Sequence, residues 1–129
     1  MMKSSTPSLQ TLLQNYFLQR LMQQRRASHE TVSSYRDTFR IYFAYLVDMH
    51  GISAINVDIK CMDLEYIQEF CKYLEEKRGN KSVTINNRIA AIRSFMQYVS
   101  EMEPEYSGIA KRALMVPMQK HKVPTMDFI

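Results

Sequence analysis

The sequence has few of the residues that break helices and build turns, with only three glycines and four prolines among its 129 residues. A sheet of many strands needs turn residues at each reversal of the chain, so this scarcity disfavours one. Leucine, methionine, glutamine, lysine and arginine are plentiful instead, and they favour long helices. Hydrophobic residues make up 46% and charged residues 23% of the chain, as in globular proteins. The sequence therefore predicts an all-α fold, and its length predicts one domain.

Cysteines are few, and the sequence has neither a cluster of histidines nor a long apolar run. Cys61 and Cys71 are the two cysteines, and with three scattered histidines they form neither a disulfide framework nor a zinc site. No stretch approaches the roughly 18 apolar residues of a membrane span, and the first residues lack the apolar region of a signal peptide. No glycine-rich phosphate loop or paired acid and base points to an enzyme acting alone. We expect a cytoplasmic protein with no cofactor, metal, membrane association or small-molecule substrate.

Apolar residues recur at helical spacing and predict four helices, with a short fifth helix before Pro117. Thr6 and Pro7 should begin the first helix, while Ser28, Asp63 and Ser82 should cap the next three. The first three expected helices cover about residues 7–25, 29–49 and 64–78, and the fourth follows the Ser82 cap and ends before Pro104.

The end of the chain lacks helical periodicity. We expect a helical domain over residues 1–118 and an extended linker over residues 119–129, leading toward a further domain. The formal net charge of +4 is a modest basic excess, compatible with a polyanionic partner but not sufficient to indicate one.

Two stretches have distinctive local patterns. Residues 28–46 read SHETVSSYRDTFRIYFAYL, with a serine cap, a Tyr-Arg pair and a Phe followed by Phe-x-x-Leu. Residues 81–98 read KSVTINNRIAAIRSFMQY, with Asn-x-Arg, Ala-Ala-Ile and Ser-Phe-x-x-Tyr. They resemble the second and fourth helices of the core-binding domain of tyrosine site-specific recombinases of the phage integrase kind. The resemblance covers about residues 8–122.

The resemblance implies a SAM-like bundle of four to five helices that forms one arm of a clamp around duplex DNA. The other arm in this family is a catalytic domain, with an arginine, lysine and histidine constellation and a tyrosine nucleophile, which uses neither metal nor ATP. No stretch of this sequence resembles that constellation, so no catalytic residue is assigned and the chain should be inactive alone. The implied role is to grip the core site during DNA integration or recombination, with other recombinase protomers as partners.

The expected fourth helix offers a surface suited to the major groove. Its inner face should be centred on Ile85, Ile89, Ile92 and Met96. The opposite face should carry small and amide side chains with arginines on its flanks, which would let the backbone approach and let Asn87 contact adenine. The residues expected on or beside this outer face are Val83, Thr84, Asn87, Arg88, Ala90, Ala91, Arg93, Ser94 and Tyr98.

Other candidate DNA contacts lie on the second helix and in short basic clusters at helix ends and in the tail. The full candidate set is Ser33, Ser34, Arg36, Arg40, Lys81, Ser82, Thr84, Asn87, Arg88, Arg93, Lys120 and Lys122. Taken without the resemblance, the outer face of the fourth helix is more typical of an ordinary solvated helix than of a DNA-binding one. Arg36 is as well suited to pairing with a carboxylate as to binding DNA.

One alternative function remains open, that of a helical protein–protein interaction module that binds through an amphipathic face. It accounts for the helices and the modest charge. It does not account for the small polar surface between arginines on the fourth helix, or for the basic tail.

Overall fold

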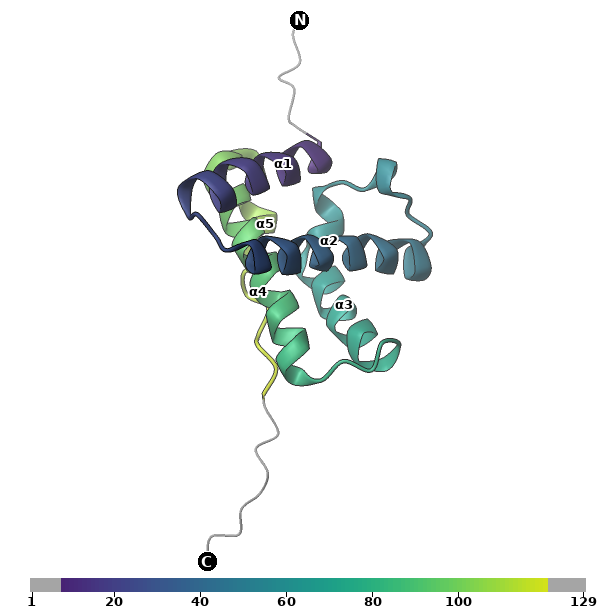
Figure 1. Ribbon diagram of the computed structural model, residues 1–129. Helices are drawn as coiled ribbons and strands as arrows, with labels where there is room; N and C mark the ends of the chain where they lie inside the picture. Colours follow the sequence, from purple (N-terminus) through teal and green to yellow (C-terminus); the bar gives the residue numbers. More distant parts are fainter. Residues whose placement is uncertain (1–7, 121–129) are drawn as a thin grey trace, which may run out of the picture.

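Helices form most of residues 8–120, the part of the chain that this computed structural model describes (Figure 1). The α-helices are α1 (Leu9–Asn15), α2 (His29–His50), α3 (Leu64–Glu76), α4 (Ser82–Met102) and α5 (Ser107–Ala113). A π-helix, η1 (Tyr16–Gln24), and the short 3-10 turns η2 (Ala54–Asn56), η3 (Ile59–Met62) and η4 (Pro104–Tyr106) complete the secondary structure. Residues 8–120 contain no strand, and the all-α prediction is confirmed.

The first predicted helix is a continuous run of two helical types. Ser8 caps α1, its Oγ accepting a hydrogen bond from the Thr11 N–H at 3.2 Å. The chain then widens into the π-helix η1, where the Arg25 N–H reaches the Arg20 carbonyl at 2.9 Å. Arg26, with a left-handed φ of 49°, turns the chain toward α2. The helical run thus matches the expected span closely, while Thr6 and Pro7 lie outside the described residues.

Two of the three other predicted caps are present. Ser28 Oγ accepts from the Thr31 N–H at 3.1 Å, and Asp63 Oδ1 accepts from the Leu64 N–H at 2.7 Å. The predicted cap at Ser82 is wrong, because Ser82 is the first residue of α4 and Lys81 stands at the N-cap without a side-chain hydrogen bond. The Ser82 hydroxyl instead donates to the Lys120 carbonyl at 3.2 Å.

Helix α4 lies at the centre of the bundle. It packs against α2, α3, α5 and η1, and α2 crosses it in Figure 1. Phe95 of α4 meets Tyr16 and Phe39 edge-on, with ring centroids 5.5 and 5.4 Å apart. A second aromatic cluster lies between α2 and α3, where the Tyr42 and Phe70 centroids are 4.7 Å apart. These contacts fix α2 across α4 and α3 beside it.

The predicted inner face of α4 is buried, but its outer face is narrower than expected. The side chains of the inner-face residues Ile85, Ile89, Ile92 and Met96 are at most 2% exposed. Tyr98, expected on the outer face, is 3% exposed, because η1 covers it: the ring lies beneath the Arg20 guanidinium. Ala91 is also fully buried. A helix with neighbours on several sides buries more than one stripe, which a single-face projection does not anticipate.

No helix within residues 8–120 is both long and apolar enough to cross a bilayer.

Replacing Ile89 with alanine should lower the free energy of unfolding by about 2 to 5 kcal/mol, because the substitution leaves a cavity in a packed core. Ile89 is fully buried on α4. Urea denaturation measures the change. Val83→Ala is the matched control on the same helix: this side chain is 58% exposed, and its loss should change stability by less than about 0.5 kcal/mol. Equal losses in the two variants would contradict the placement of α4.

Candidate nucleic-acid interface

The exposed side of α4 is a narrow line of small and amide side chains, here called the α4 stripe. Asn87 and Gln97 are exposed along it, while Ala90 and Ser94 are half-buried between them. Thr84 lies beside the stripe and is half-buried. The stripe consists of Val83, Asn87, Ala90, Ser94 and Gln97. Because these side chains are short or flexible, the α4 backbone is open to close approach by a partner.

Arg88, on the flank of the stripe, joins α4 to α2. Its Nη1 donates to the Ser34 carbonyl and to Thr38 Oγ1, both at 3.2 Å. The buried Arg88 Nε has no hydrogen-bond partner, and Thr38 itself is fully buried. This guanidinium therefore has an intramolecular role where the two helices cross. It brings Ser34 and Arg88, two of the predicted contacts, directly together.

Arg93, on the other flank, holds the C-terminal segment. Its Nη1 donates to the carbonyls of Leu114 and of Val116, the latter at 3.1 Å. Farther along the same segment, the Asn86 side chain donates to the Gln119 carbonyl at 3.0 Å and accepts from the Gln119 N–H at 2.6 Å. With the Ser82 contact to Lys120, these bonds hold residues 114–120, here called the C-terminal strap, along α4.

The strap ends at the N-terminal end of α4 (Figure 1). Lys81 and Lys120 are both exposed there, and Ser82 links the two segments. Gln119 and Lys120, which the sequence assigns to the linker, thus lie against the domain. Lys122 and the rest of the predicted linker lie outside the described residues.

The three exposed candidates on α2 follow one another at spacings of three and four residues. Ser33 and Arg36 are exposed, and the Arg36 guanidinium lies over the Phe17 ring, 5.8 Å from its centroid. Arg40 is exposed and forms an ion pair with Asp37 at 2.8 Å. Such an exposed pair contributes little to stability and leaves most of the guanidinium free to meet another anion.

The comparisons with known proteins agree with this architecture. Residues 15–101 match the family model described as the phage integrase N-terminal SAM-like domain. The chain belongs to the phage integrase family. This integrase-family domain is 37% identical over 112 residues to the protein named "Putative integrase/recombinase y4rD" of Sinorhizobium fredii (strain NBRC 101917 / NGR234), covering 87% of the chain and 40% of that protein.

A second relative from the same strain, named "Putative integrase/recombinase y4rC", is 36% identical over 122 residues, which are 95% of the chain and 37% of the relative. The domain therefore spans about two fifths of the length of these relatives. No solved structure matches the chain significantly. The predicted family and the SAM-like all-α fold are confirmed.

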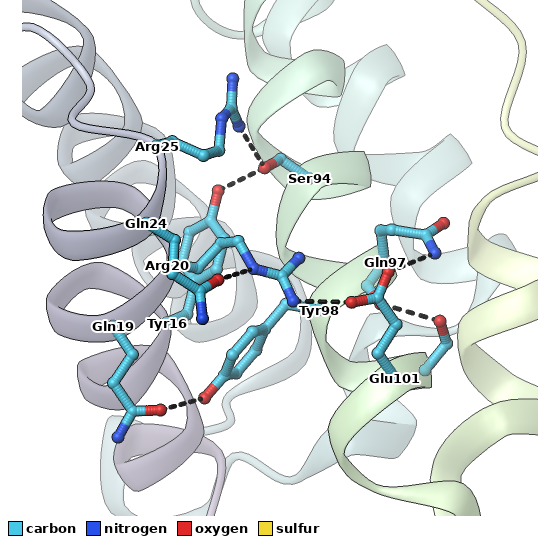
Figure 2. A network of polar contacts seen from close by, with 10 residues as sticks. Tyr16, Gln19, Arg20, Gln24, Arg25, Ser94, Gln97, Tyr98 and Glu101 are labelled. Carbon is cyan, nitrogen blue, oxygen red and sulfur yellow. Dashed lines mark hydrogen bonds and ion pairs between the residues drawn. The ribbon is translucent and has the colours of Figure 1, made fainter.

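A polar network connects η1 to α4 at the far end of the stripe (Figure 2). Ser94 Oγ accepts from the Tyr16 hydroxyl at 2.6 Å and from Arg25 Nη1 at 3.2 Å. Arg20 Nη2 pairs with Glu101 at 2.6 Å, and Gln97 donates to the same carboxylate at 2.9 Å. Burial raises the pKa of Tyr16 to about 12, so its hydroxyl stays protonated and donates.

The roles of Asn86 and Ser94 were not predicted from the sequence. Asparagine in the middle of a helix is a signal in itself, because its side chain competes for backbone hydrogen bonds and favours caps and turns. Asn86 also lies four residues after Ser82 and seven before Arg93, which places all three on one side of a helix. That pattern indicates a polar side of α4, but not that a strand-like segment covers it.

Replacing Asn86 with alanine should release Gln119 and speed hydrogen exchange at its amide, because the side chain supplies both hydrogen bonds to that residue. Amide exchange followed by NMR measures the effect. Asn87→Ala is the matched control, since Asn87 is exposed on the adjacent side of the helix. An unchanged exchange rate of the Gln119 amide in Asn86→Ala would show that the C-terminal strap is held without these two hydrogen bonds.

Proposed function

We propose that this domain grips duplex DNA at the core site as the DNA-binding arm of a tyrosine site-specific recombinase. The observation that carries the proposal is the α4 stripe. Over residues 83–97, where neighbours cover the other sides of the helix, the exposed side carries small and amide side chains, which suit a helix entering the major groove. Family membership supports it.

The proposed contacts fall into three groups. Asn87 on the α4 stripe and Thr84 beside it read base edges, and the Asn87 amide can form a bidentate contact with adenine. Exposed residues on α2 and at the N-terminal end of α4 bind backbone phosphates, and residues with partners inside the domain support them. The phosphate group is Ser33, Arg36, Arg40, Lys81 and Lys120, with Lys122 in the tail. The supporting group is Ser34, Ser82, Arg88 and Arg93.

We assign strand cleavage and joining to the remaining part of such a recombinase, and none of these steps to the residues of this domain. Other recombinase protomers would be partners in a synaptic complex. We propose that the domain acts on DNA in the cytoplasm. The buried free thiols of Cys61 and Cys71 are compatible with that reducing compartment.

The domain should bind duplex DNA with an affinity that falls steeply as salt rises, because phosphate neutralisation releases counterions and dominates the binding energy. Fluorescence anisotropy with a labelled duplex at several salt concentrations measures the slope. Binding that is insensitive to salt, or no binding to any duplex at low salt, would reject the proposal and favour a protein–protein interaction module.

The two kinds of contact should separate by mutation. Asn87→Ala and Thr84→Ala should each reduce discrimination between target and non-target duplexes by about 1 to 3 kcal/mol if each removes a base contact. Arg36→Gln should instead weaken binding to all sequences similarly and flatten the salt slope by about one unit. Competition binding measures both effects, with circular dichroism as the check on folding. Unchanged specificity in both folded α4 variants would show that α4 is not the recognition helix.

A further inference from the structure

The far end of the α4 stripe opens into a hollow of about 410 Å³ between η1, α2 and α4, here called the arginine hollow. Arg20 and Arg25 line it from η1 and the turn after it, and Tyr35 lines it from α2. Arg93, Ser94 and Gln97 line it from α4. Ser94 and Gln97 belong to the stripe itself, so the hollow continues the surface assigned to DNA.

Positive charge in the arginine hollow exceeds negative charge. Glu101 pairs with Arg20 and offsets one of the three guanidinium groups. Within residues 8–120, no carboxylate lies within ion-pair distance of Arg25 or Arg93. Three guanidinium groups around one concave site favour an anion, because they repel one another and an anion offsets that repulsion.

Ser94 has a hydrogen-bond donor to spare. Its oxygen accepts from the Tyr16 hydroxyl and from Arg25, which uses its two lone pairs. Neither bond uses the serine proton, and within residues 8–120 Ser94 donates to no acceptor. A hydroxyl donor beside a guanidinium is a pairing that suits phosphate oxygens, which are strong acceptors.

We propose that the arginine hollow binds a phosphate group, with Arg25 and Ser94 as its direct ligands. This inference rests on the proposed DNA binding, which it deepens by assigning the group to a backbone phosphate beside the α4 stripe. Arg93 adds positive charge while its Nη1 holds the C-terminal strap. Arg20 is paired with Glu101 (Figure 2).

The test compares Arg25→Gln with Lys72→Gln, which removes the same charge from the exposed side of α3. Arg25 is exposed, so its replacement should leave the fold intact. In duplex titrations over a salt series, Arg25→Gln should reduce the magnitude of the slope of log K against log salt by about 0.9, the value for one phosphate contact. Lys72→Gln should leave the slope unchanged.

A second arm uses inorganic phosphate at constant ionic strength, followed by the NMR shifts of the Ser94 amide and the Arg25 side chain. Saturable shifts of the Ser94 amide that disappear in Arg25→Gln support the phosphate site. Saturable shifts together with an unchanged duplex slope would overturn the assignment to DNA in favour of free phosphate. An unchanged slope with no specific shifts would overturn the whole inference.

Two further outcomes separate this inference from the proposed function. In the first, the native chain binds duplex DNA and Arg25→Gln binds it equally well. That result would overturn the arginine hollow as a DNA phosphate site and leave the DNA-binding function standing. In the second, the native chain binds no duplex DNA. That result would reject both the DNA-binding function and the assignment of the ligand to a DNA backbone phosphate, and the NMR shifts with inorganic phosphate would then show whether the hollow binds phosphate at all.

Discussion

Helix α4 packs against α2, α3, α5 and η1 at once, and this crowding determines which of its side chains can meet a partner. Ile89 and Phe95 face the core, while Tyr98 is covered by η1. Between Val83 and Gln97, the most accessible side chains form one narrow line, and beyond it Glu101 and Met102 are exposed at the end of the helix. Because large side chains on that line would keep a partner at a distance, its small and amide residues are what make the helix suitable for a groove. The proposed interface and the arginine hollow both lie along this line.

Two arginines that look like DNA ligands in the sequence hold the domain together in the structure. Arg88 bonds to α2 where the helices cross, and Arg93 bonds to the carbonyls of the C-terminal strap. A guanidinium carries five donors, so Arg93 can bond carbonyls that lie outside the helices, and Arg88 can bond both a carbonyl and a hydroxyl of α2. Asn86 and Ser82 extend the same arrangement to residue 120. Together they place Lys120 beside Lys81, at the end of α4 that is proposed to lie against DNA.

The local sequence predicted the helices well because their signals are local. Ser28, Asp63 and Gly51 end or begin helices through bonds and dihedral angles within a few residues. Ser82 carried the same signal, yet its hydroxyl bonds to Lys120, 38 residues away. The Ile85, Ile89, Ile92 and Met96 face was likewise predictable from periodicity, whereas the burial of Tyr98 and Ala91 depends on the elements that pack around α4.

For this integrase-family domain, the sequence by itself determined the all-α fold, the approximate helix spans, the inner face of α4 and the family. Hydrophobic periodicity, caps and turn residues act over a few residues, so one chain contains them completely. Tertiary structure alone decided which polar side chains form hydrogen bonds within the domain. Arg93 reaches carbonyls 21 and 23 residues away, and Ser94 meets Tyr16 across 78 residues. Such pairings depend on how the helices cross, and a hydrogen bond requires its two atoms to lie about 3 Å apart, a condition that residue types and spacing do not specify.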